Sequence, residues 1–232
     1  MKHPPLGIIF DMDGVIVDSM PYHFLAWYEA LRPLGVRVSC FDVFSREGER
    51  WEKSLRDFLK RARIKPTNTL LKKIFTYRQK IFRNYFKRIL FQGVEDFLVC
   101  LKEKGYLLGL VTGTPKVEIE DILPRRIQKL FHCLVAGDQV RLGKPSPQPY
   151  LKALKLLGLS SRECVVVENA PLGIKSAKRA GVFCIALATS LPDEYLKAAD
   201  VVVDKLEDIM PIINPSTLRP KGWSLSYLPG SL

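Results

Sequence analysis

The sequence contains few cysteines, and their arrangement suggests neither a metal site nor disulfides. Its 232 residues include 5 cysteines, an odd number, scattered along the chain without a CxxC pair. Zinc sites need cysteines at characteristic spacings, and disulfides need an oxidising compartment. We therefore expect reduced side chains that belong to the core: Cys40, Cys100, Cys133, Cys164 and Cys184.

The chain also lacks a long apolar run, an internal repeat and room for a signal peptide. No run approaches the roughly 20 apolar residues that cross a bilayer. Asp11 follows after only ten residues, which is too early for a signal peptide with its cleavage site. With 47% apolar and 26% charged residues, the composition is that of a soluble globular protein. We expect a cytoplasmic protein that does not contact membranes.

Acidic residues are scarce relative to basic ones, and the imbalance is local. The chain has 36 Lys and Arg against 24 Asp and Glu, a formal charge of +12. Residues 20–91 hold 17 of the basic and 6 of the acidic residues, so the remainder is almost neutral. We expect most of these charges to form a solvated helical surface. A basic segment also attracts anionic substrates, phosphate above all.

Six short apolar runs end in Gly, Asp, Thr or Asn, as buried parallel strands often do. Helical stretches separate several of them, and this alternation predicts an α/β fold with an open, doubly wound parallel sheet. Such sheets bind ligands beyond the carboxyl ends of their strands. The predicted strands are 6–10, 107–112, 134–136, 164–168, 183–187 and 201–203. The predicted helices between them are 93–104, 147–157, 172–180 and 192–198.

Residues 20–91 differ from this pattern, because they show helical spacing of apolar residues and no convincing strand. Pro21 and Gly93 stand near the two edges of the segment and suit hinges. We divide the chain into an α/β core of residues 1–19 and 92–213, a helical insertion of residues 20–91, and a tail of residues 214–232 without periodicity. The predicted helices of the insertion are 22–34, 51–62, 67–74 and 78–89.

Two carboxylates follow the first predicted strand. Side chains at i and i+2 of a strand point to the same face, so Asp11 and Asp13 should project together from its end. Two close carboxylates repel, and one is driven to hold a proton unless a cation lies between them. The pair fits a nucleophile and an acid/base sharing a metal site. An Asp-rich turn after a strand is the simpler alternative.

Later strand ends carry groups that suit a phosphate. Thr112, Gly113 and Thr114 place a hydroxyl and tight-turn backbone amides at one strand tip, where they can hydrogen-bond phosphate oxygens. Lys144 lies in a Gly-Lys-Pro loop, where its ammonium can neutralise a phosphate. Each has a simpler interpretation, an ordinary capped turn for the threonines and a solvent-facing side chain for the lysine.

Glu168 and Asn169 bring two oxygen-bearing side chains to the end of another buried strand. Hard cations such as Mg²⁺ prefer oxygen ligands and keep several waters. The pair therefore suits a magnesium site, whereas the alternative for Asn169 is a helix N-cap.

In this order, the motifs resemble the haloacid dehalogenase superfamily, in its branch with a helical cap inserted after the first motif. They are residues 11–15 (DMDGV), 112–114 (TGT), 144–145 (KP) and 168–174 (ENAPLGI), and the resemblance extends to about Ile213. Residues 18–27 look like the start of the cap in β-phosphoglucomutases and their phosphatase relatives. Residues 46–49 look like the substrate-specificity loop of that cap.

The resemblance implies roles for the core residues. Asp11 would attack phosphorus and form an aspartyl-phosphate, and Asp13 would serve as the acid and base. Mg²⁺ would be held by Asp11, the backbone carbonyl of Asp13, Glu168 and Asn169. Relatives commonly carry aspartate where Asn169 stands, so we predict weaker Mg²⁺ affinity here.

Thr112 and Lys144 would hold the transferring phosphoryl group by the same resemblance, with the turn of Gly113 and Thr114 beside them. Dehalogenases and phosphonatases of the superfamily do not keep the second aspartate. Asp13 therefore indicates cleavage or transfer at a phosphate ester.

Candidate substrate-binding residues in the cap are weighed against packing and surface roles. His23 reaches the active site or packs in the cap. Trp27, at i+4 from His23, stacks on a sugar or fills the cap core. Arg46 is the first candidate for a second anion contact, with Arg78 and Lys80 after it; surface charge is the alternative for all three.

We expect a monomeric, Mg²⁺-dependent phosphatase for small phosphorylated metabolites such as sugar phosphates or phosphoglycolate. A phosphoglucomutase would use the same residues but return the phosphoryl group to a sugar hydroxyl. A nucleic-acid-binding protein on an inactive scaffold is the alternative from another class, based on the basic cap. The intact motif residues argue against it.

Overall fold

The computed structural model describes residues 7–213. Its centre is a parallel sheet in the order β3-β2-β1-β4-β5-β6, the arrangement of a doubly wound α/β fold. The sequence-based fold class is confirmed, and all six predicted strands are present with ends shifted by at most one residue. The strands are β1 (Gly7–Asp11), β2 (Leu107–Val111), β3 (Cys133–Val135), β4 (Cys164–Glu168), β5 (Phe183–Leu187) and β6 (Val201–Val203).

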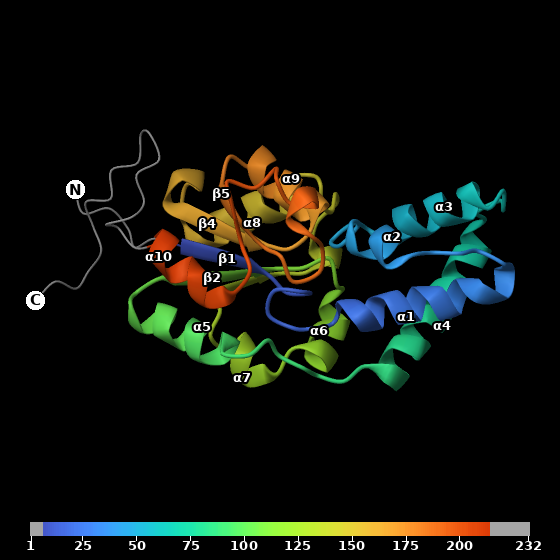
Figure 1. The fold of residues 1–232 in the computed structure, drawn as a ribbon, viewed down its shortest axis with the longest axis horizontal. Coiled ribbons are helices and arrows are strands. Elements are labelled where there is room, and N and C mark those ends of the chain that lie inside the picture. Colours follow the sequence, from blue (N-terminus) through green and yellow to red (C-terminus); the bar gives the residue numbers. More distant parts are fainter. Residues whose placement is uncertain (1–6, 214–232) are drawn as a thin grey trace, which may run out of the picture.

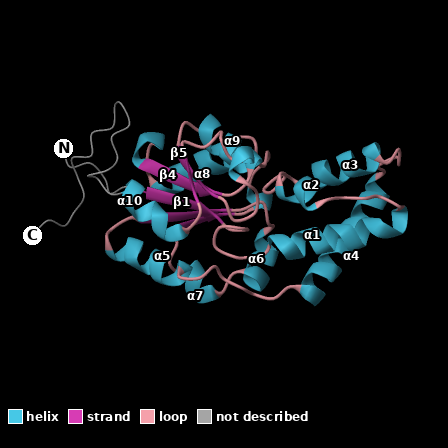
Figure 2. Ribbon diagram, in the orientation of Figure 1, coloured by secondary structure: helices cyan, strands magenta, loops and turns pink. Residues whose placement is uncertain are grey.

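Helices cover both faces of the sheet (Figures 1 and 2). Alternate residues of β1 point to opposite faces, as a strand requires. Ile8 and Phe10 join the core that includes α5 (Val94–Glu103), whereas Ile9 joins the core that includes α8 (Gln148–Leu157). The remaining helices of this part are α6 (Lys116–Ile122), α7 (Arg125–Gln128), α9 (Pro171–Arg179) and α10 (Ile209–Ile213).

Between β1 and α5 the chain forms helices that lie beyond one end of the sheet (Figure 1). These helices and the loops between them are called the cap below. They are α1 (Met20–Leu31), α2 (Cys40–Phe44), α3 (Trp51–Arg61) and α4 (Asn68–Tyr85), with a 3₁₀ turn, η1 (Arg32–Leu34).

The two chain segments that join the cap to the sheet are hydrogen-bonded to each other. Asp18 N donates to the Ile89 carbonyl oxygen at 2.9 Å, and Phe91 N donates to the Ile16 carbonyl oxygen at 3.1 Å. Val17 and Leu90 form an isolated antiparallel bridge between them. Entry to and exit from the cap therefore form one paired connection.

Two helix predictions were wrong. The predicted break at residues 75–77 is absent, because no Gly or Pro interrupts α4 and its buried face continues through Ile74, Arg78 and Ile81. The predicted helix at 192–198 is only a 3₁₀ turn, η4 (Asp193–Tyr195). Leu196 is the one buried side chain in that segment, too little burial to stabilise a helix.

Helices α2, α6, α7 and α10 have four to seven residues each and were not predicted, because they are too short to show a helical period. The predicted tail, residues 214–232, lies outside the described residues. Within residues 7–213, no helix combines the length and the apolar character needed to cross a membrane.

Candidate active site

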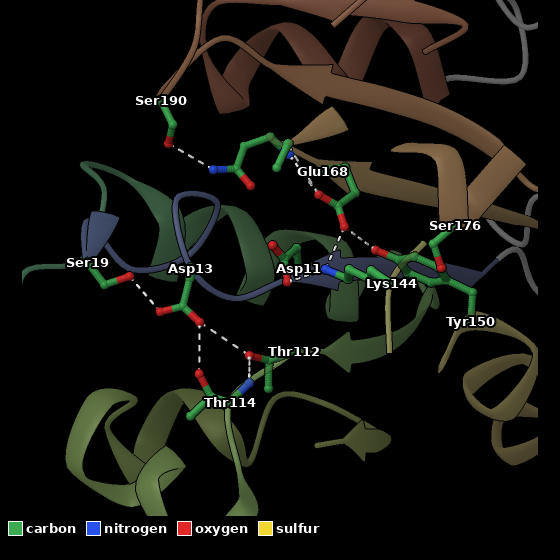
Figure 3. Close-up of polar contacts among 12 residues, drawn as sticks. Asp11, Asp13, Ser19, Thr112, Thr114, Lys144, Tyr150, Glu168, Ser176 and Ser190 are labelled. Carbon is green, nitrogen blue, oxygen red and sulfur yellow. Dashed lines mark hydrogen bonds and ion pairs between the residues drawn. The ribbon is translucent and has the colours of Figure 1, made fainter. Parts of the chain in front are cut away.

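The site lies where the order of strands reverses, between β1 and β4. Asp11 ends β1 and Glu168 ends β4, and Thr112 follows β2 directly. Because β1 pairs with both β2 and β4 in parallel register, the three side chains meet at one edge of the sheet (Figure 3). Crevices at such reversals are where open α/β sheets bind ligands.

Lys144 bridges the two carboxylates that end the central strands. Its Nζ lies 2.7 Å from Asp11 Oδ1 and 2.6 Å from Glu168 Oε1 (Figure 3). Burial would lower the pKa of Lys144, but the two adjacent carboxylates outweigh it and raise that pKa. The lysine therefore stays charged inside the protein, and the alternative of a solvent-facing side chain is wrong.

Asp11 is completely buried. Burial raises its pKa from 3.8 to about 8, because the charge of Lys144 only partly offsets burial and the neighbouring charges of Glu168 and Asp13 add to it. Its Oδ2 accepts no hydrogen bond from any residue between 7 and 213. A buried carboxylate oxygen without a partner is costly, so this atom is available to a cation or to phosphorus.

Asp13 is also buried, but both of its carboxylate oxygens accept hydrogen bonds, unlike Asp11 Oδ2. Its Oδ1 accepts hydrogen bonds from Ser19 Oγ at 2.6 Å and from His23 Nε2 at 2.9 Å. Its Oδ2 accepts from the hydroxyls of Thr112 and Thr114, each at 3.2 Å. Burial alone would raise the pKa of Asp13, but the pairing with His23 and the Ser19 hydroxyl lower it from 3.8 to about 2.

His23 connects this carboxylate to the cap. Arg78 Nη2 lies 2.5 Å from His23 Nδ1, and arginine can only donate, so Nδ1 accepts. The ring proton then lies on Nε2 and is donated to Asp13. The imidazole also stacks on Phe82 with ring centroids 4.7 Å apart. His23 thus reaches the active site and packs in the cap at the same time.

The Thr-Gly-Thr turn reaches the site, with its hydroxyls on Asp13. Thr112 Oγ1 donates to Asp13 and accepts from Thr114 N at 3.0 Å. Both threonines were predicted to contact a phosphate. In this structure their hydroxyls donate to Asp13, and Thr112 Oγ1 also accepts from the Thr114 N–H. Gly113 faces the cap, since a Cβ there would come within 2.8 Å of Gly48 Cα.

Glu168 is held by partners on both oxygens. Tyr150 OH donates to Oε1 at 2.5 Å (Figure 3), and the backbone N–H groups of Asn169 and Ala170 donate to Oε2 at 3.0 and 3.4 Å. With Lys144 also on Oε1, the carboxylate is fixed in orientation. Gly173 lies against it, because a Cβ there would overlap Glu168 Oε1 at 1.9 Å.

The residues present fit a magnesium ion. Asn169 donates through Nδ2 to Ser190 Oγ at 2.8 Å, which leaves its buried Oδ1 without a partner among the described residues. Asp11 Oδ2 is in the same state. Mg²⁺ prefers such oxygens and retains waters.

Within residues 7–213, no three His, Cys, Asp or Glu side chains are grouped as ligands of one metal ion. A cation here would therefore depend on the Asn169 amide oxygen and on backbone oxygens or water. The side-chain oxygens of Asp13 are engaged, so its role through the backbone carbonyl stays a prediction.

A cavity lies between the cap and the sheet, and the predicted cap residues separate into those that line it and one that does not. Arg46 lines the cavity, but its Nη1 is paired with Glu49 at 2.8 Å and with Asp57 at 3.0 Å. Trp27 lines the same cavity as a buried side chain, 7% exposed, and carries the guanidinium of Arg78 5.5 Å from its ring centroid. It is both core and cavity wall.

The structure does not place Lys80 at the cavity, contrary to its prediction as a substrate-binding residue. It is exposed on α4 and does not line the cavity, whereas Arg78 does. Residues two positions apart in an α-helix lie about 200° apart around its axis, so Arg78 and Lys80 point to opposite sides of α4.

The loop of residues 46–50 closes the cap onto the sheet. Gly48 has φ +77°, and a Cβ there would lie 2.2 Å from Lys144 Cδ. Arg50 Nη1 donates to the carbonyl oxygens of Val140 and Arg141, both at 3.3 Å. On the other side of the cap, Gln79 Nε2 donates to Glu118 Oε1 at 2.5 Å.

The cavity between cap and sheet has a volume of about 80 Å³. Pockets for small ligands typically measure about 300–1,000 Å³. The structure therefore corresponds to a closed arrangement that has to open before a sugar-sized molecule enters.

Four residues at the site were not selected as candidates from the sequence: Ser19, Tyr150, Ser190 and Glu47. Ser19 and Tyr150 are buried polar residues within predicted apolar surroundings, which indicates a hydrogen-bonding role but not its partner. Glu47 lies in the loop identified as a specificity loop, and its role depends on how the cap packs.

Comparison with known proteins agrees with this geometry. Residues 8–187 match the family described as haloacid dehalogenase-like hydrolase. A phosphorylated carbohydrates phosphatase of Thermotoga maritima is 32% identical over 218 residues, covering 89% of this chain and 97% of the relative. A β-phosphoglucomutase of Bacillus subtilis is 28% identical over 215 residues, covering 88% and 91%.

A solved structure shows the same fold. The β-phosphoglucomutase of Clostridium difficile superposes with a TM-score of 0.77 at 23% identity, over 89% of this chain and 96% of that one. The family match spans most of the chain and includes the ends of β1, β2 and β4, where the polar groups converge. The chain is therefore a member of the haloacid dehalogenase-like hydrolase family.

Proposed function

We propose that this protein is a Mg²⁺-dependent phosphatase that acts on small phosphorylated metabolites through an aspartyl-phosphate. The observation that carries the proposal is the difference between two carboxylates on one strand end. Asp11 keeps an unpartnered oxygen and lies next to Lys144, whereas Asp13 is held in a ring of hydrogen-bond donors.

In the first step, Asp11 Oδ2 attacks phosphorus, and the bond from phosphorus to the ester oxygen breaks. Asp13 takes up a proton from solvent as the substrate binds and gives it to the leaving oxygen. A substrate phosphate next to Asp13 raises the proton affinity of that carboxylate, because like charges disfavour ionisation. His23, donating from Nε2, keeps Asp13 aligned with the leaving oxygen.

In the second step, water attacks the aspartyl-phosphate and gives its proton to Asp13. The bond between phosphorus and Asp11 breaks, inorganic phosphate leaves and both carboxylates return to their starting state. Lys144 neutralises negative charge on the phosphoryl oxygens in both steps. Bound Mg²⁺, held by Asp11 and Asn169 with Glu168 nearby, would offset repulsion between the attacking carboxylate and the phosphoryl group.

Two of the relatives support this assignment of reaction type. One is named as a phosphatase of phosphorylated carbohydrates and another as a β-phosphoglucomutase. The second name keeps a mutase as the alternative, in which a sugar hydroxyl replaces water in the second step. A cytoplasmic location and a monomeric state stay predictions from the sequence.

Phosphorus NMR of β-glucose 1-phosphate with a trace of glucose 1,6-bisphosphate separates the two reactions. We expect free phosphate, whereas accumulation of glucose 6-phosphate would identify a mutase.

A panel of phosphate monoesters assayed with and without Mg²⁺ tests the proposal itself. We expect turnover that requires the metal and falls by at least about 10³-fold in Asp11→Asn. Activity retained in Asp11→Asn, with an unchanged melting temperature, would overturn the mechanism.

A further inference from the structure

A second cavity, with a volume of about 340 Å³, lies outside the active site, where the end of α4 meets α6. Sites for small ligands typically measure about 300–1,000 Å³. None of the residues that line it belongs to the lining of the active-site cavity, so a ligand here would not occupy the reacting centre. The walls are two aromatic rings, two guanidinium groups and one carboxylate: Phe82, Phe86, Arg83, Arg88 and Asp121.

The two aromatic rings of this cavity are held in place by their neighbours. Phe82 stacks on both His23 and Phe86, with ring centroids 4.7 and 4.8 Å apart. Tyr22 meets Phe86 edge to face at 5.4 Å. Phe82 is buried, whereas Phe86 is only half-buried and leaves part of its ring at the cavity. The rings therefore form a fixed apolar surface on which a planar group can stack.

The two arginines present donors that the protein does not use. Arg88 donates from Nε and Nη2 to the carbonyl oxygen of Asp121 at 3.2 and 2.7 Å, and its Nη1 makes no hydrogen bond within residues 7–213. Arg83 makes no hydrogen bond in that range, and its Nε lies 3.6 Å from the Asp121 carboxylate. Two guanidiniums against one carboxylate leave the lining of the cavity positively charged, which suits a phosphate group.

We propose that this cavity binds a nucleoside monophosphate, with its base on Phe86, its phosphate on Arg83 and Arg88, and its ribose hydroxyls toward Asp121. A nucleotide combines a planar ring, an anion and hydroxyl donors. Arginine can only donate and a carboxylate can only accept, so the phosphate and the hydroxyls have different partners in the wall. A sugar phosphate lacks the ring and a nucleoside lacks the anion. The inference goes beyond the proposed function and does not depend on it.

Isothermal titration calorimetry of the full-length protein with AMP, in EDTA to withhold the metal proposed for turnover, tests this inference. We expect a Kd below about 1 mM. The Kd should rise with salt concentration, because Arg83 is exposed and its charge is screened. Adenosine and ribose 5-phosphate, each lacking one of the two recognised groups, should bind at least about tenfold more weakly than AMP.

Two variants locate the nucleotide. Arg83→Gln removes one guanidinium, and Phe86→Leu keeps an apolar side chain but removes the stacking ring. Each should raise the Kd for AMP by about tenfold. Arg37→Gln, which changes another exposed arginine of the cap, is the matched control for Arg83→Gln and should leave the Kd unchanged. Melting temperatures within a few degrees of wild type, about the effect of a surface substitution, verify that the variants are folded.

The outcomes separate this inference from the proposed phosphatase function. An unchanged Kd for AMP in both Arg83→Gln and Phe86→Leu would place the nucleotide elsewhere and overturn the inference. The absence of AMP binding would overturn it too, as would equal affinity for adenosine or ribose 5-phosphate. Hydrolysis of p-nitrophenyl phosphate with Mg²⁺, measured in the same preparation, reports on the proposed function independently.

Discussion

The strand ends and the cap wall hold their polar residues in different ways. At the strand ends, Lys144 bridges two carboxylates and Asp13 accepts from four different side chains. On the cap wall, Arg46 and Glu49 are satisfied within the cap itself, and Glu47 has no partner among the described residues. The polar groups at the strand ends are therefore held in place by the protein itself, whereas Glu47 on the cap wall is not paired by the described residues.

Lys144→Met should have the largest effect, and it tests the polar residues at the strand ends. The change leaves Asp11 and Glu168 buried without a cation between them. We expect phosphatase activity to fall by about 10³-fold and the free energy of unfolding by about 3 kcal/mol, measured by steady-state kinetics and urea denaturation. Lys175→Met, at an exposed position of α9, is the control and should change neither quantity. Activity within tenfold of wild type would show that Lys144 is not needed at the reacting centre.

The pH dependence of stability separates the two aspartates. The pKa of Asp11 is about 8 when folded against 3.8 in the reference state, so the folded protein binds the extra proton between these values. Stability should therefore fall as the pH rises from 5 to 8 in EDTA, by at least about 2 kcal/mol more in wild type than in Asp11→Asn. Urea denaturation at several pH values measures this difference.

Asp13 provides the opposite sign as a control. Its folded pKa of about 2 lies below 3.8, so its contribution to stability is present above pH 4 and is lost as the pH falls toward 2. Asp13→Asn should therefore remove the loss at acid pH, and it should lessen but not abolish the slope between pH 5 and 8, because the charge of Asp13 is one of several causes of the raised pKa of Asp11. Parallel curves for wild type and Asp11→Asn would contradict the assignment of a raised pKa to Asp11.

Asn169→Asp tests whether the free amide oxygen faces a cation. A carboxylate at this position can still accept from the Ser190 hydroxyl and adds a negative charge to the predicted metal site. We expect the dissociation constant for Mg²⁺, measured by calorimetry without substrate, to fall by about tenfold. An unchanged constant and an unchanged Mg²⁺ requirement for activity would argue against Asn169 as a ligand.

Arg50→Ala should have the smallest effect, because it changes how the cap closes and not what it encloses. The arginine ties the closing loop to the carbonyl oxygens of Val140 and Arg141 at the exposed rim. We expect KM to rise about two- to fivefold, with kcat nearly unchanged and unfolding free energy within about 1 kcal/mol. A large loss of kcat would show that this tie also positions the reacting groups.

The sheet and the convergence of polar residues at its strand ends were predictable because two simple patterns coincide. Buried parallel strands are continuous apolar runs, and their carboxyl ends meet at one edge. Polar residues directly after those runs, such as Asp11, Thr112 and Glu168, are therefore brought together whatever lies between them in sequence. The boundaries of the insertion at 19/20 and 91/92 stay a prediction.

The cap wall was harder to predict, because it depends on helix phase and on packing between segments. The sequence-based prediction placed a break at residues 75–77. That break hid the helical register that puts Arg78 on the same face as Ile74 and Ile81. With that register, Lys80 falls on the exposed side. The contacts of Tyr150 with Glu168 and of Ser190 with Asn169 join residues 18 and 21 positions apart, and no local pattern marks them.

The paired connection between Val17 and Leu90 has a consequence for the motion that admits substrate. Asp18 is hydrogen-bonded to Ile89, and Phe91 to Ile16. The two chain segments that join the cap to the sheet are therefore held to each other. The two segments therefore move as one unit when the cap moves relative to the sheet. Each closure then returns Gly48 to the same place over Lys144, at a small cost in conformational entropy.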